Sequence, residues 1–166
     1  MVRGESSSST ELIDSSDYIR REVVLAELEE RQTITVALLD QARAVIDAGP
    51  TEGNRLRGLA DRLQDEVHAY QLFKHCRIFD PTIAGGSPSS REAARCLKAD
   101  CIAGGAAFSF SVRQWRDRDL QTGWDEFRPA VLDLGTRLRD HLKAEGVQIR
   151  LLLWHLREEA SARAEV

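Results

Sequence analysis

The sequence lacks the features that mark membrane, secreted and nucleic-acid-binding proteins. No apolar run reaches the roughly 18 residues that a membrane-spanning helix needs. The N-terminal residues MVRGESSSSTE lack the apolar segment of a secretory signal. The net charge is −4, and 23 Lys and Arg are mixed with 27 Asp and Glu, so no basic surface for nucleic acid is indicated. We therefore expect a cytoplasmic protein that binds neither membranes nor nucleic acid.

Cysteine is also scarce. The three present are Cys76, Cys96 and Cys101. An odd number without metal-finger spacing argues against both a disulfide framework and a zinc finger. Because free cysteine is usually buried, we interpret all three as reduced, buried structural thiols.

Signals for strands and for catalytic loops are missing as well. No segment alternates apolar and polar residues over the length of a strand, and no Asn-Gly or Asp-Gly hairpin signal occurs. There is no nucleophile elbow, and Gly104-Gly105 does not follow a strand as a phosphate-binding loop would. The sequence predicts an all-α protein, and we expect no enzymatic activity unless the chain binds a metal.

Four long helices are predicted from apolar residues that recur at helical spacing. The first follows a disordered, Ser-rich tail of residues 1–16 and reaches about residue 47, with residues 27–32 as either a break or a continuous segment. The others are predicted at about 55–79, 90–118 and 123–159. Since the connections are short, residues 17–161 should form an up-down-up-down four-helix bundle.

Specific signals mark some of the predicted helix ends. Ser89 with Glu92 three residues later is a capping box for the third helix. Thr122 and Asp125 have the same spacing at the start of the fourth. Pro81, followed by a Gly-Gly pair, predicts the end of the second helix at about residue 79.

The last predicted helix places His141 and Glu145 four residues apart, so both side chains lie on one face. A histidine and a carboxylate stacked in this way inside a helical bundle are components of non-heme iron sites. On the second predicted helix, His68, Gln71 and His75 are further candidates to face the same interior.

With these helices in view, residues 25–157 resemble the hemerythrin-like (HHE cation-binding) family. That family holds a di-iron site with a His on the first helix and a His-x3-Glu pair on both the second and the last helix. The stretch 141–145, HLKAE, fits the last pair in full. GGAAFSFSVRQW at 104–115 is similar to the Gly-rich third helix of some members, and WDEF at 124–127 stands where they have an aromatic motif.

The other ligand positions depart from the family pattern. Aligned on the Phe-Asp-Pro ending at residues 79–81, Gln71 stands at the His position of the second helix and His75 at the Glu position. Aligned on His68 instead, Leu72 stands at the Glu position and the proline falls three residues late. On the first helix, the His position falls at Glu30 or Arg31. The resemblance therefore implies a reduced site rather than a complete di-iron centre.

Two hypotheses follow from the resemblance. In the first, the iron site is lost and the bundle is a binding, sensing or regulatory module for a protein partner or for a small ligand in its core. Arg31 would then replace the metal and pair with Glu145. In the second, iron or another divalent metal handles oxygen or peroxide, held by His75, His141 and Glu145, with His68 or Gln71 as further contacts. The substitutions at the ligand positions favour the metal-free hypothesis.

Two interaction hypotheses are independent of metal. Residues 133–153 are loosely similar to the last helix of all-helical anti-sigma proteins, which would make a sigma factor the partner. An apolar stripe on residues 12–28 could form a homodimer surface.

Overall fold

The computed structural model describes the backbone of residues 7–164 and the side chains of residues 20–163. The described part contains no strand, which confirms the all-α prediction. Its elements are α1 (Ser7–Ala48), a 3-10 turn (Pro50–Glu52), α2 (Gly53–Lys74), a π-helical turn (His75–Phe79), α3 (Asp80–Gly85), α4 (Pro88–Arg116) and α5 (Trp124–Ala164).

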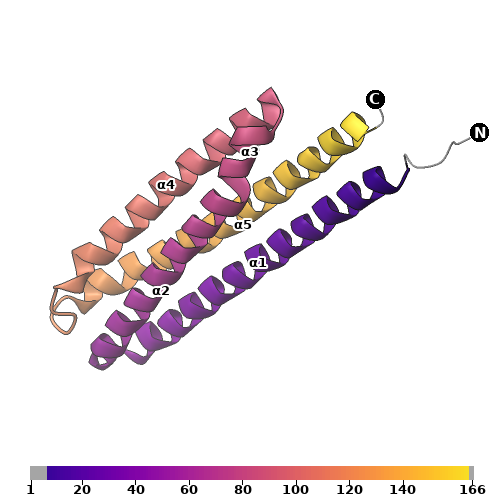
Figure 1. Ribbon diagram of the computed structural model, residues 1–166. Coiled ribbons are helices and arrows are strands. Elements are labelled where there is room, and N and C mark those ends of the chain that lie inside the picture. Colours follow the sequence, from indigo (N-terminus) through magenta and orange to yellow (C-terminus); the bar gives the residue numbers. More distant parts are fainter. Residues whose placement is uncertain (1–6, 165–166) are drawn as a thin grey trace, which may run out of the picture.

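The four long helices lie alongside one another (Figure 1). Both α1 and α4 pack against α2 and α5, so α1 lies diagonally across the interior from α4, and α2 from α5. The beginning of α1 and the end of α5 lie at the same end of the molecule (Figure 1). None of the helices in the described part of the chain has an apolar segment long enough to span a membrane.

α1 is continuous through residues 27–32, where the sequence allowed either a break or a continuous helix. Its charged side chains are paired along the helix surface: Arg31 lies 3.3 Å from Glu27 one turn earlier and 3.6 Å from Glu66 of α2. Pairs at this spacing support a helix. α1 begins at Ser7, so it includes part of the predicted tail, whereas residues 1–6 lie outside the described part.

The second helix does not end at Pro81 as the sequence predicted. The helical path continues through the π-helical turn into α3, which ends at Gly85. In this turn the N–H of Asp80 donates to the carbonyl of His75, five residues earlier. A π turn adds one residue to the helix, and Pro81 then falls in the first turn of α3, where a missing N–H costs little.

The start of α4 also corrects a prediction, because the N-cap is Ser87 rather than Ser89. The Oγ of Ser87 accepts a hydrogen bond from the N–H of Ser90 at 3.2 Å. Pro88 follows at the first helical position, which its fixed φ favours. Ser89 is exposed, and Glu92 pairs with a side chain of its own helix instead of closing a capping box.

α5 begins one residue after the predicted boundary. The carbonyl of Gly123 accepts the first helical hydrogen bond, from the N–H of Phe127 at 3.0 Å. The hydroxyl of Thr122 bonds to Asp119 in the preceding turn, so Thr122 does not cap the helix. α5 then continues to Ala164, five residues beyond the predicted end at Glu159.

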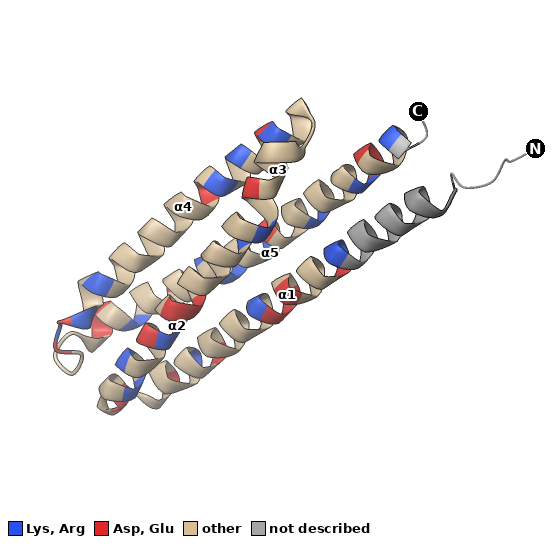
Figure 2. Ribbon diagram, in the orientation of Figure 1, with Lys and Arg blue, Asp and Glu red and all other residues tan. Residues whose placement is uncertain are grey.

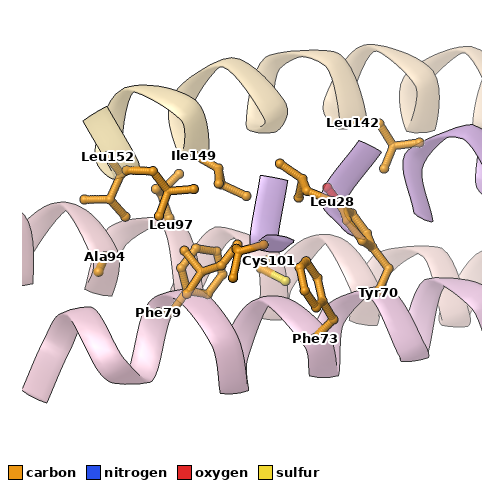
Figure 3. Close-up of a cluster of buried hydrophobic side chains, with 13 residues drawn as sticks. Leu28, Tyr70, Phe73, Phe79, Ala94, Leu97, Cys101, Leu142, Ile149 and Leu152 are labelled. Atoms are coloured by element: carbon orange, nitrogen blue, oxygen red, sulfur yellow. The ribbon is translucent and has the colours of Figure 1, made fainter. Parts of the chain in front are cut away.

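Two hydrophobic clusters fill the interior. The first lies toward the end of the molecule that holds the end of α5, and Figure 3 shows its side chains projecting from the surrounding helices into one space. It includes Val24, Leu28, Tyr70, Phe73, Phe79, Cys101, Leu142 and Ile149. The second lies toward the opposite end and includes Leu38, Leu39, Ile46, Leu59, Leu63, Val67, Phe108, Leu120 and Phe127.

The burial of Val24 and Leu28 in the first cluster places part of the predicted homodimer stripe inside the bundle. The side chains of residues 12–19 lie outside the described part. Charged residues are spread over all four long helices, whereas residues 101–112 in the middle of α4 carry no charge (Figure 2).

Candidate functional site

The centre of the molecule contains a buried ion pair between Lys74 and Glu145. Their side chains are 2% and 3% exposed. The Nζ of Lys74 lies 2.6 Å from Oε1 and 2.7 Å from Oε2 of Glu145, so one ammonium donates to both carboxylate oxygens. Lys74 is the last residue of α2 and Glu145 lies within α5. The pair therefore joins two helices that lie diagonally across the interior.

Aromatic and amide groups surround this pair. The Nζ of Lys74 lies 3.9 Å from the centroid of the Tyr70 ring, which is cation–π geometry. From α1, the Nε2 of Gln32 donates to the Tyr70 hydroxyl and to the carbonyl of Leu142, both at 3.0 Å. Burial, together with the negative charge of Glu145, raises the pKa of Tyr70 well above its usual range. Tyr70 is therefore a neutral hydroxyl.

Two helical glycines make room for amide side chains at this level. The Nε2 of Gln71 donates to the carbonyl of Cys101 at 2.7 Å, and a Cβ at Gly105 would overlap this amide. A Cβ at Gly146 would lie 2.7 Å from the Nε2 of Gln32. The small residues in the middle of α4 and α5 thus admit polar side chains from neighbouring helices.

Cys101 is buried, as predicted, and burial raises the pKa of its thiol. It is therefore a neutral thiol. The prediction was wrong for Cys76 and Cys96, which are both exposed. Cys76 lies in the π-helical turn and Cys96 on α4, each on the outside of its helix. All three cysteines are free.

His141 and Glu145 lie on one face of α5, as their spacing predicted, but in different environments. The Nε2 of His141 is 3.9 Å from Oε1 of Glu145, and the histidine side chain is 39% exposed. His141 borders a half-open cavity of about 240 Å3 between α2, α4 and α5, which Tyr70, Lys74 and Cys101 also line. Solvent thus reaches the level of the ion pair along the edge that His141 forms.

His75 follows Lys74 but is not joined to Glu145 by a hydrogen bond or an ion pair among the described contacts. Its Nε2 is buried without a hydrogen-bond partner, and its ring lies 5.8 Å from that of Phe79. Burial, with the nearby positive charge of Lys98, lowers the pKa of His75. The ring is therefore held in its neutral form.

The cation that faces Glu145 is Lys74, and not Arg31 as the sequence suggested. Arg31 lies half-buried at the boundary of α1 and α2, where it pairs with Glu27 and Glu66. The reason is geometric, because its position on α1 faces α2 rather than the interior. The predicted ion pair between Arg31 and Glu145 is therefore wrong, and Glu145 pairs with Lys74 instead.

Lys74 is not among the residues that the sequence predicts for the site, because lysine is almost never fully buried. A signal was nevertheless present. The apolar stripe of α2 runs through Leu63, Val67 and Tyr70, and Lys74 stands one helical turn after Tyr70 on the same face. A single lysine at the end of an otherwise apolar stripe implies a carboxylate partner in the core.

Of the predicted metal ligands, His141 and Glu145 lie close together, whereas His68 and Gln71 have other surroundings. His68 is exposed on the outside of α2, and the amide of Gln71 is bonded to α4. Among the residues whose side chains are described, no three His, Cys, Asp or Glu form a group that could hold a metal ion. Both oxygens of Glu145 accept hydrogen bonds from Lys74, so the iron that the resemblance implies does not fit this arrangement of side chains.

Comparisons of the chain with models of protein families, with curated proteins and with solved structures give no match. The resemblance to hemerythrin-like proteins therefore rests on sequence motifs alone, and no comparison supports it. Function is inferred from the geometry around Lys74 and Glu145.

Proposed function

We propose that this chain is a metal-independent, hemerythrin-like up-down-up-down bundle that serves as a binding, sensing or regulatory module. In it, the ammonium of Lys74 takes the place of a metal ion beside Glu145. The observation that carries this proposal is the contact of Nζ with both carboxylate oxygens, at 2.6 and 2.7 Å, in a setting where both side chains are almost fully buried.

The energetics of a buried carboxylate support this proposal. A carboxylate in an apolar interior is unfavourable unless a cation compensates its charge and hydrogen bonds satisfy its oxygens. A metal ion with its other ligands is one solution, and a lysine ammonium is another. Because Lys74 supplies both the charge and the hydrogen bonds to Glu145, the bundle needs no metal to close around this acid.

A metalloprotein is the second candidate, and two observations favour it. The Nε2 of His75 is buried without a partner, and His141 lies beside Glu145. A divalent ion at Glu145 would have to displace the Lys74 ammonium, leaving that charge inside the hydrophobic cluster or forcing its deprotonation. Both outcomes are costly, which favours the metal-free module.

Metal analysis distinguishes the two candidates. Protein purified from iron-supplemented cells should hold less than about a tenth of an equivalent of iron, and added Fe(II) should leave the melting temperature unchanged, because only a ligand that binds the native state raises it. Stoichiometric metal that disappears in His141→Ala but persists in His155→Ala, a change at an exposed histidine of the same helix, would establish the metalloprotein instead.

A further inference from the structure

A second cavity lies in the hydrophobic cluster at the other end of the bundle. Its volume is about 140 Å3, and all four long helices contribute to its wall. Hydrocarbon and aromatic groups form most of the lining, including Leu39, Leu63, Phe108, Trp115, Phe127 and Val131. The edge of Trp115 meets Phe127 with ring centroids 5.3 Å apart, which gives the cavity an aromatic side.

Three of the four arginines that line this cavity form ion pairs, and the fourth, Arg57, donates to the backbone carbonyls of Arg116 and Arg118. Arg139 of α5 pairs with Asp40 of α1 at 2.6 Å, and Arg116 of α4 pairs with Asp61 of α2. Each of these pairs joins two neighbouring helices beside the cavity. Because each of the lining arginines already has an ion-pair or hydrogen-bond partner and most of the lining is apolar, an apolar, uncharged ligand matches this cavity.

Gly135 of α5 lines this cavity and is a helical glycine that close packing does not require. A glycine inside a helix costs about 1 kcal/mol relative to alanine. Unlike Gly105 and Gly146, Gly135 is not crowded, because a Cβ there would lie 3.9 Å from the nearest atom, in Leu39, which is an ordinary contact. Gly135 lines the cavity, so its missing side chain leaves the space open at the expense of helix stability.

We propose that this cavity binds a small, uncharged apolar molecule in the size range from benzene to indole. An enclosed apolar cavity of about 150 Å3 in another protein binds benzene, and this partly open cavity offers a similar volume and an apolar lining. Aromatic ligands can add edge-to-face contacts with Trp115 and Phe127. This inference rests on the proposed binding function, to which it gives a ligand class, and it uses a site separate from Lys74 and Glu145.

The test is a titration of the full-length chain with benzene and with indole, followed by calorimetry, with tryptophan fluorescence as a second readout for benzene. Gly135→Leu places a side chain in the cavity. Gly58→Leu is the matched control, because Gly58 is an exposed helical glycine with no atom near its Cβ position. We expect wild type and Gly58→Leu to bind alike, and Gly135→Leu to bind at least about tenfold more weakly, a difference of roughly 1.4 kcal/mol.

Absence of binding to the wild type up to the solubility limit of the probes would overturn the inference, as would equal affinity in Gly135→Leu. If circular dichroism shows that Gly135→Leu does not fold, Ala60→Leu replaces it, since Ala60 lines the cavity from α2 and should weaken binding likewise. If the chain is free of metal but binds neither probe, the proposed ligand site is refuted and the metal-independent function stands. If the chain binds the probes and also holds stoichiometric iron, the metal-independent function is refuted and the proposed ligand site stands.

Discussion

At the scale of single residues, the interior places an ion pair close to titratable side chains that are kept neutral. Lys74 and Glu145 form a buried ion pair. Tyr70 and Cys101 are kept neutral, because burial raises the pKa of each. His75 is kept neutral for the opposite reason, since burial lowers the pKa of a base. The net charge of this part of the core is therefore close to zero.

His75 predicts a dependence of stability on pH. Its pKa in the folded chain lies below the ordinary value of 6.5, because of burial and of Lys98, while Asp80 acts in the opposite direction. The unfolded chain consequently binds more protons as the pH falls below 6.5. The stabilisation due to a neutral His75 is complete above that pH and is lost as the pH falls through the lower, folded pKa.

This is measured as the free energy of unfolding between about pH 5 and pH 8. In His75→Gln, the loss of stability between pH 6.5 and the folded pKa should be smaller than in wild type. His68→Gln, a change at an exposed histidine of α2, should retain the wild-type slope. Parallel curves for wild type and His75→Gln would show that His75 is not held neutral.

The sequence was informative about single residues where spacing alone decides their position. His141 and Glu145 share a face of α5 as the four-residue spacing requires. The sequence could not rank Lys74, Arg31 and Gln32 by depth, because the face that each presents depends on how α1 and α2 are rotated against their neighbours. That rotation is set by packing of the whole bundle rather than by local pattern.

At the scale of elements, α4 and α5 are joined at one end by hydrogen bonds to a single carboxylate. The hydroxyls of Ser87 and Ser90 each donate to Oε1 of Glu159 at 2.6 Å, and the backbone N–H of Ser87 donates to Oε2 at 3.2 Å. These bonds hold the pKa of Glu159 below its usual range. The residue that caps α4 therefore also binds the end of α5.

Ser87→Ala should destabilise the chain by about 1–2 kcal/mol, because it removes both the N-cap and a hydroxyl bonded to Glu159. Ser89→Ala is the natural comparison, since Ser89 is exposed and caps nothing. It should change stability by less than about 0.5 kcal/mol. The free energy of unfolding of the two variants, measured by chemical denaturation, tests this prediction. A larger loss in Ser89→Ala would support the predicted capping box at Ser89 instead of the N-cap at Ser87.

The existence of the four long helices was predictable because apolar residues at helical spacing persist over each of them. The residues at which these helices begin and end were less predictable. Ser87 and Ser89 are both acceptable caps, and the choice between them depends on Pro88, which starts the helix early. The π-helical turn at residues 75–79 could not be read from the sequence, since Pro81 alone is equally consistent with the end of a helix.

At the scale of the whole molecule, the polar groups lie near the boundary between the two hydrophobic clusters. Gln32 and His141 fall between the residues that α1 and α5 give to the two clusters. Gln71 follows Tyr70 of the first cluster, and Lys74 and Glu145 lie about one turn further into that cluster. We expect the ion pair at this level to disfavour a slip of α2 against α5, because a slip would leave the carboxylate buried without its cation.

The most direct test of the central role of this ion pair is a double-mutant cycle at Lys74 and Glu145, measured by urea unfolding in the presence of a metal chelator. Lys74→Met should cost about 3–5 kcal/mol, because it leaves a buried carboxylate uncompensated, whereas the double variant Lys74→Met/Glu145→Leu should recover most of this loss. Additive losses in the double variant, or a Lys74→Met protein as stable as wild type, would contradict the account.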